Sequence, residues 1–414
     1  MLKMMSQRRR CNRFKGKGGV MMKNIVIIGG GYAGINLLEG LKKEFQGQIG
    51  KSVRVLLIDK NSYHFKKVLL VRAAIRDINL KVPFSEYCQD GIEFIRGEAL
   101  TLNKRKQQLI IKVENEKTIN VSYDYLVLAF GSIIRSIPEE IGGITLKDGH
   151  SALKIKEDLV AGMKSFQALG KSEQDQRLFK IAVVGGGIAG IETAAEIAVW
   201  SKEKLEEVGV QSSSVEVLLF DTKDRLLPDA PAKVSEKLIN QLNKHGVTVK
   251  HKTRVSYWKD GQLFTSDGQN YAVETCIFNP GVEANPVIQK LDLPLTEQHK
   301  IIVNHSYQVK NEPHIYSIGD CALIVDHKNN QPDGMTCKEA IPQATRLSKI
   351  LKAAINGVPL VILHESYPVK FFCISLGPNS GFMWTQKWGL DFTVTGKLGA
   401  RIRNYTWDLA SLHK

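Results

Sequence analysis

The chain has 414 residues, of which 43% are hydrophobic and 24% charged, and its formal net charge is +15. This length predicts two or three domains, and the composition excludes fibrous and disordered proteins. Because no run of 18 apolar residues occurs, no transmembrane helix is predicted. The basic start lacks the apolar region of a secretory signal.

Residues 1–21 contain seven Lys and Arg residues and no acidic residue. The stretch KGKGGV before Met21 and Met22 would be encoded by a purine-rich run that resembles a bacterial ribosome-binding site. We therefore expect 1–21 to be a disordered leader that is not translated. A nucleic-acid or targeting tail and a functionless basic stub are the alternatives, and no nucleic-acid partner is expected.

The first motif spans Asn24–Leu41 and reads NIVIIGGGYAGINLLEGL. An apolar strand at Ile25–Ile28 leads into glycines with G-x-G-x-x-G spacing and then into a stretch of helical period. Such glycines allow a tight turn, a close approach to a pyrophosphate and close helix–strand packing. The acidic residue Asp59, at the end of a second apolar run, completes the fingerprint of a dinucleotide-binding unit.

The remaining elements are expected in the following order. Strands are predicted at Val53–Asp59, Glu93–Ile95 and Tyr123–Ser132, a hairpin or meander over 99–121, a linker over Ser136–Thr145 and a helix over His150–Phe166; further strands are predicted within Thr275–Pro286, His314–Ala322 and Val369–Leu376, with a helix over 339–355.

The opening pattern returns in Lys180–Trp200, KIAVVGGGIAGIETAAEIAVW. A strand at Ile181–Val184 precedes three glycines with the same spacing, a helix follows, and a later apolar run ends at Asp221. Chance recurrence of the strand, glycines, helix and acid together is improbable. The repeat therefore predicts two dinucleotide-binding units in one chain.

The ordered motifs GGGYAG, YLVLAFGS, GGGIAGIE, NPGVEANP and IYSIGDCA resemble the flavoproteins with two dinucleotide-binding domains. Within them, the chain is similar to type II NADH:quinone dehydrogenases and apoptosis-inducing-factor-like quinone reductases, from Lys23 to about Leu398. The resemblance implies an α/β fold with two Rossmann-like domains and a C-terminal α+β segment. It places the FAD domain at 22–140 and 283–365, the NAD(P)H domain at 141–282 and the C-terminal segment at 366–414.

The resemblance also implies the cofactors, FAD and NADH, and the residues that bind them. These residues are Gly29, Gly31, Tyr32, Ala33, Gly34, Asp59, Lys60, Gly131, Gly185, Gly187, Gly190, Asp221, Gly281, Gly319 and Asp320. The Asp221 carboxylate favours NADH because it repels a 2′-phosphate, although Lys223 and Arg225 nearby leave NADPH possible. Glu192 is placed near the nicotinamide and flavin as a candidate catalytic residue with a positioning role; an exposed helix glutamate is the alternative.

The cysteines narrow the choice of electron acceptor. They are Cys11, Cys88, Cys276, Cys321, Cys337 and Cys373, without a C-x-x-C pair, which fits a reducing cytosol and argues against a disulfide framework or metal cluster. No redox cysteine follows Asp59 where the related disulfide reductases carry a pair. A quinone, a redox protein or oxygen therefore remains as the acceptor.

The quinone reductases usually carry A-Q-x-A-x-Q after the Gly-Asp turn, where this chain has Lys338–Gln343. Gln343 keeps the second glutamine and is a candidate catalytic residue, or else a polar residue that faces its own helix. Glu339 replaces the first glutamine. Pro342 predicts a helix that begins later, close to the proline.

The C-terminal segment places Leu398, Ile402, Tyr405, Leu409 and Leu412 on one helical face. Lys397, Arg401 and Arg403 lie beside it, and Trp384, Trp388 and Trp407 fall in the same segment. This pattern suits an anionic lipid surface, which predicts peripheral attachment to the cytoplasmic face of a bacterial membrane. Docking on the body of the protein or on a second subunit, as in a homodimer, is the alternative.

We therefore predict an FAD-dependent NADH:quinone oxidoreductase. Two other classes stay open: a flavin-binding sensor or interaction protein with weak turnover, and a soluble NAD(P)H reductase for a ferredoxin-like protein, whose acidic surface would suit this basic chain.

Overall fold

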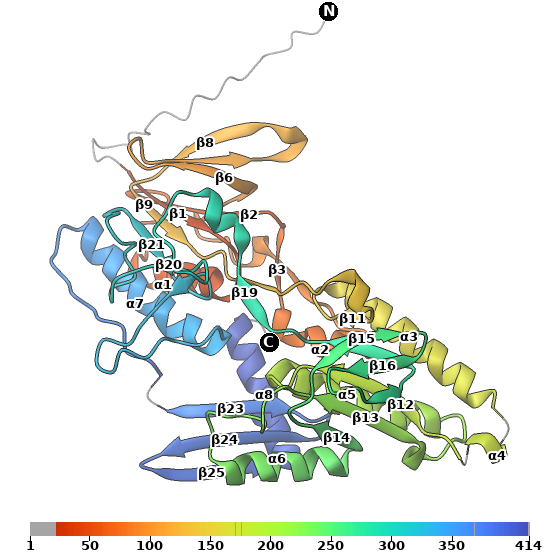
Figure 1. Ribbon diagram of the computed structural model, residues 1–414. Coiled ribbons are helices and arrows are strands. Elements are labelled where there is room, and N and C mark those ends of the chain that lie inside the picture. Colours follow the sequence, from red (N-terminus) through yellow and green to blue (C-terminus); the bar gives the residue numbers. More distant parts are fainter. Residues whose placement is uncertain (1–21, 170, 175, 368, 413–414) are drawn as a thin grey trace, which may run out of the picture.

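The computed structural model describes residues 22–169, 171–174, 176–367 and 369–412 (Figure 1). The predicted leader, residues 1–21, lies outside the described residues.

The first sheet is parallel and has the order β21–β9–β1–β2–β5. Its strands are β1 (Lys23–Ile28), β2 (Val53–Asp59), β5 (Glu93–Arg96), β9 (Tyr125–Leu128) and β21 (Ile315–Ser317). Side chains of both β1 faces are buried, which explains the continuous apolar run in the sequence. Helices α1 (Tyr32–Glu44) and α7 (Cys337–Ile355) share the core on one face. The other face packs on the antiparallel meander of β6 (Glu98–Asn103), β7 (Gln108–Lys112) and β8 (Thr118–Ser122).

The second sheet repeats this plan with the parallel order β11–β18–β12–β13–β14. Its strands are β11 (Ile144–Thr145), β12 (Phe179–Val184), β13 (Val215–Phe220), β14 (Val247–Lys250) and β18 (Thr275–Phe278). Helices α3 (Gly149–Gln167), α5 (Ile188–Glu206) and α6 (Ala232–Lys244) contribute to the core on one face. The strands β15 (Val255–Lys259), β16 (Gln262–Thr265) and β17 (Asn270–Ala272) form the antiparallel sheet that contributes to the core on the other.

The remaining elements are short. The antiparallel ribbon of β10 (Ser132–Ile134) and β19 (Val282–Ala284) runs between the two units. The others are β3 (Tyr63–Phe65), α2 (Leu70–Ala73), β4 (Lys81–Pro83), α4 (Lys171–Gln174), β20 (Ile301–Ile302) and β22 (Ala322–Leu323).

The C-terminal segment folds as an antiparallel sheet with one helix. It consists of β23 (Lys370–Ser375), β24 (Gly381–Lys387), β25 (Leu390–Thr395) and α8 (Gly396–Ser411). Figure 1 shows α8 beside this sheet, with its end close to α7. The two parallel sheets and this α+β segment confirm the predicted fold class.

Helix α7 begins earlier than Pro342 predicts. Its first residue is Cys337, and Thr336 and Glu339 form a reciprocal capping box. Pro342 therefore lies inside the helix and removes one backbone donor. The expectation of a later start was wrong because the capping box organises the first turn ahead of the proline.

Candidate functional site

In the first glycine turn, two glycines allow close packing of the backbone and a third leaves space for a cofactor. A Cβ on Gly34 would lie 2.0 Å from the Gly29 carbonyl oxygen, so this glycine lets α1 approach β1. A Cβ on Gly29, which has a φ of +102°, would lie 2.2 Å from the Ala129 oxygen. A Cβ on Gly31, the N-cap of α1, would meet nothing within 4 Å. Gly31 thus leaves open space in front of a helix N-terminus, where a pyrophosphate would fit.

Asp59, at the end of β2, faces this turn. Its Oδ2 accepts a hydrogen bond of 2.7 Å from the Gly30 N–H, and its Oδ1 accepts one of 2.8 Å from the Asn61 N–H. Burial raises the pKa of this carboxyl, and the two backbone hydrogen bonds oppose the shift. The neighbouring Lys60 is exposed, and its carbonyl oxygen accepts a hydrogen bond from Arg96.

The second turn has the same construction. A Cβ on Gly190 would lie 1.7 Å from the Gly185 oxygen, whereas one on Gly187 would meet nothing within 4 Å. The buried Asp221 carboxylate lies against Gly186, because a Cβ there would be 2.3 Å from its Oδ2. Arg225 donates to the carbonyl oxygens of Ala230 and Pro228, which commits it to its own loop.

Asp320, at the predicted Gly-Asp turn, lies in a cluster with two side chains that the sequence did not single out. Ser132 Oγ donates to Asp320 Oδ2 at 2.6 Å, and Lys67 Nζ lies 3.3 Å from that Oγ. Burial raises the pKa of Asp320, while Ser132 and Lys67 oppose this shift. Burial lowers the pKa of Lys67. The cluster joins three segments that are distant in sequence, so no local motif could have revealed it.

The two predicted glycines Gly131 and Gly281 lie at opposite ends of the antiparallel β10–β19 ribbon. The Arg135 N–H donates to the Gly281 carbonyl, and the Asn285 N–H donates to the Gly131 carbonyl. Both glycines have positive φ, and a Cβ on either would meet nothing within 4 Å. They therefore leave open space where the strands of the two sheets end.

Glu192 is buried, with 3% exposure, so the alternative of an exposed helix glutamate was wrong. Its Oε1 accepts hydrogen bonds from Arg403 Nε and the Ser375 N–H, both at 2.8 Å, and its Oε2 accepts one from Arg403 at 3.1 Å. The C-terminal helix α8 thus supplies a cation to the start of α5.

A second ion pair lies directly beside the first. Arg72 donates to the fully buried Glu196 at 2.8 Å. The guanidinium carbons of Arg72 and Arg403 lie 4.4 and 4.6 Å from the Trp407 ring centroid. The stacking of two cations on one buried indole anchors α8 to the body of the protein.

Tyr32 and Ala33 follow the first turn on α1. Tyr32 Oη accepts a hydrogen bond from the Val68 N–H, and its ring lies edge-on to His64. His64 is fully buried, with Nδ1 2.9 Å from the Gly30 carbonyl oxygen. Burial lowers the pKa of His64 to about 4, which keeps the imidazole neutral beside the turn. No motif in the sequence indicates a role for His64.

Gln343 is buried, with 2% exposure, and lies beside the Gly-Asp turn. Its amide oxygen accepts a hydrogen bond from the Gly319 N–H at 2.8 Å, and its amide nitrogen donates to Asp333 at 2.9 Å. The structure therefore brings Gln343, the candidate residue of the quinone motif, to the predicted FAD-binding turn. Its role in the reaction stays a prediction.

The family model of pyridine nucleotide-disulphide oxidoreductases matches residues 23–344, which is most of the chain. The chain belongs to this family. The resemblance stated from the motifs is confirmed. The residues present fit two dinucleotides, because the open Gly31 and Gly187 lie in turns that pack on the carboxylates of half-buried Asp59 and buried Asp221.

Similar proteins extend over nearly the whole chain. A type II NADH:quinone oxidoreductase of Haemophilus influenzae is 28% identical, covering 85% of this chain and 83% of that protein. The NADH dehydrogenase-like protein YutJ of Bacillus subtilis is 23% identical, covering 87% and 92%. The structure of NDH2 from Plasmodium falciparum in complex with NADH superposes with a TM-score of 0.75 at 16% identity, covering 94% of each chain. At that identity the structural likeness shows the fold alone.

Proposed function

We propose that the protein oxidises NADH with bound FAD and passes the electrons to a quinone at a membrane surface. The observation that carries this proposal is the pair of glycine turns, each with its acid, at the ends of β1 and β12. The activities after which the relatives are named support NADH as donor and a quinone as acceptor. When bound, FAD accepts a hydride from the nicotinamide and delivers electrons to a second substrate.

The chain's own residues would hold and orient the two cofactors. Gly31 and Gly187 leave room for the pyrophosphates, and the carboxylates of Asp59 and Asp221 would accept hydrogen bonds from the two riboses. The Lys67 ammonium, 3.3 Å from Ser132 Oγ, would add positive charge near Asp320. No cysteine lies between Asp59 and Cys88, which supports direct transfer to the acceptor.

We expect NADH to bleach the flavin absorbance of the purified protein under anaerobic conditions, and NADPH to do so much more slowly. The Asp221 carboxylate would repel a 2′-phosphate, and Arg225 is occupied by its own loop. Stopped-flow absorbance measures both rates, and a second mixing with menadione tests the acceptor. Absence of bleaching would contradict the oxidoreductase. Bleaching without reoxidation by menadione would favour a ferredoxin-like protein as the acceptor.

We further propose that the outer face of α8 contacts lipid. Leu398, Tyr405 and Leu409 are 57%, 66% and 49% exposed, and Lys397 and Arg401 are exposed beside them. The tryptophan part of the prediction was wrong in detail, because Trp384 and Trp407 are buried in the body of the protein and Trp388 is exposed. Among the described residues, no helix is long and apolar enough to cross a bilayer.

The combined variant Leu398→Ser, Tyr405→Ser and Leu409→Ser is expected to weaken binding to anionic vesicles at least about tenfold, because each lost contact removes about 1 kcal/mol or more. Vesicle co-sedimentation of the full chain measures this. Val361→Ser, on an exposed loop outside α8, is the control. Equal binding of both variants would contradict the lipid contact, and loss of a dimer in analytical ultracentrifugation would assign the face to a second subunit.

A further inference from the structure

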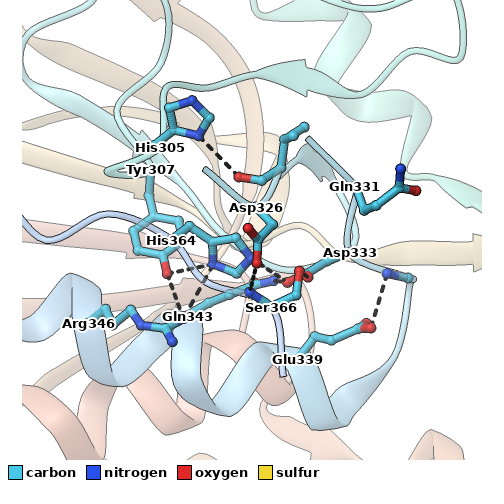
Figure 2. A network of polar contacts seen from close by, with 12 residues as sticks. His305, Tyr307, Asp326, Gln331, Asp333, Glu339, Gln343, Arg346, His364 and Ser366 are labelled. Carbon is cyan, nitrogen blue, oxygen red and sulfur yellow. Dashed lines mark hydrogen bonds and ion pairs between the residues drawn. The ribbon is translucent and has the colours of Figure 1, made fainter. Parts of the chain in front are cut away.

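A buried polar network surrounds Gln343 (Figure 2). Asp333 Oδ2 accepts from Gln343 Nε2 at 2.9 Å and lies 3.0 Å from His364 Nε2. Asp333 Oδ1 accepts from Ser366 Oγ at 2.7 Å. His364 is 1% exposed, and Tyr307, on its other side, is fully buried. The network thus links the connection before β23 to the Gly-Asp turn.

The donors around His364 fix its tautomer. Arg346, which can only donate, has a guanidinium nitrogen 3.4 Å from Nδ1, and Tyr307 Oη lies 3.0 Å from the same atom. Burial raises the pKa of Tyr307 to about 12, so its hydroxyl keeps the proton that it donates. Nδ1 is therefore an acceptor, and the remaining imidazole proton lies on Nε2, the nitrogen 3.0 Å from Asp333 Oδ2.

Asp333 in turn fixes the orientation of the Gln343 amide, that is, which side its oxygen and nitrogen face. Burial acts to raise the pKa of this carboxyl, but the nearby His364 and the hydrogen bonds from Ser366 and Gln343 outweigh burial and lower the pKa. A carboxylate can only accept, so the amide NH₂ group must face it. The amide oxygen then faces the Gly319 N–H, 2.8 Å away. Gly319 has a φ of +76° and precedes Asp320.

The residue at the first glutamine position of the A-Q-x-A-x-Q motif, Glu339, is also held by hydrogen bonds within the protein. Glu339 accepts hydrogen bonds from the Gly334 N–H, the Thr336 N–H and Thr336 Oγ1. It therefore caps α7. Both side chains at the glutamine positions of the motif are thus engaged by the protein itself.

We infer that Gln343 is a positioning residue that fixes the Gly319–Asp320 turn, and that Asp333 and His364 set the direction of its amide. This inference rests on the proposed function, which supplies the quinone as electron acceptor. A positioning role and direct binding of the acceptor predict different effects of substitution. If Gln343 positions the turn, its replacement alters flavin properties and kcat; if Gln343 binds the acceptor, its replacement alters the KM for the acceptor.

The test uses the full-chain holoprotein and the variants Gln343→Glu, Asp333→Asn and the combination of both. Gln343→Glu sets two acceptors against each other, and Asp333→Asn replaces a carboxylate that can only accept with an amide that can also donate. The combination restores one donor–acceptor pair and the net charge. Each single variant is expected to lower kcat with menadione about tenfold or more, since small displacements at a reacting centre cost up to about 100-fold. It should also shift the flavin midpoint potential and leave the KM for menadione within twofold. The combination should recover most of both.

The control is His305→Gln, because His305 is exposed and its ring contacts the Val325 carbonyl and the His327 ring rather than Gln343 or Asp333. A tenfold rise in the KM for menadione, with kcat and potential unchanged, would overturn the inference, as would a combination no better than the single variants. Reduction of ferricyanide by NADH and the flavin potential remain measurable if the wild-type protein does not reduce menadione. Failure of the proposed acceptor and failure of the inference are therefore separate results.

Discussion

Replacement of Arg403 by methionine is expected to lower the free energy of unfolding by about 3–5 kcal/mol, because it leaves a buried carboxylate without its cation. Glu192 and Arg403 side chains are 4% and 13% exposed, and two hydrogen bonds join them. The change also removes one of the two guanidinium groups on Trp407. Urea unfolding of the holoprotein, followed by circular dichroism, measures the loss.

Arg401→Met is the matched control, since Arg401 lies on the same helix and is exposed. It should change stability by less than about 0.5 kcal/mol. Adding Glu192→Gln to Arg403→Met removes the unpaired buried charge and should recover part of the lost free energy of unfolding. Equal stability of the Arg403 and Arg401 variants would show that the ion pair contributes little.

The contrast between these two arginines shows where prediction from sequence ended. The pattern of α8 indicated an apolar face with basic residues beside it, and the exposed Leu398, Tyr405 and Leu409 follow that pattern. Periodicity does not reveal what lies opposite the other side of the helix. Arg403 meets Glu192 across 211 positions of sequence, so neither the pair nor its burial was visible in any local window.

The glycine turns were predictable for the opposite reason. Strand, turn, helix and acid lie within one βαβ unit, and local spacing determines their geometry. The strand Val53–Asp59 has the predicted bounds, and Asp59 faces the turn as the fingerprint requires. At Gln343 the sequence located the residue next to the Gly-Asp turn but not its partners, because Asp333 and His364 come from irregular segments that carry no periodic signal.

The second large effect is expected at the glycines, where matched alanine substitutions separate folding from cofactor binding. Gly34→Ala would place a methyl group 2.0 Å from the Gly29 oxygen, so α1 must move away from β1. We expect about 1–3 kcal/mol of lost stability from this overpacking, together with loss of FAD. The bound flavin absorbance and the urea midpoint measure the two effects.

Gly31→Ala should behave differently, because its methyl group would meet no protein atom within 4 Å. Stability of the apoprotein should stay near that of the wild-type apoprotein, while FAD affinity falls roughly 10- to 100-fold through lost close contacts to the pyrophosphate. Gly187→Ala is the counterpart in the second unit: it should keep FAD and raise the KM for NADH by a similar factor. Loss of FAD in the Gly187 variant, or unchanged affinity for FAD in the Gly31 variant, would contradict the assignment of the first turn to FAD and the second to NADH.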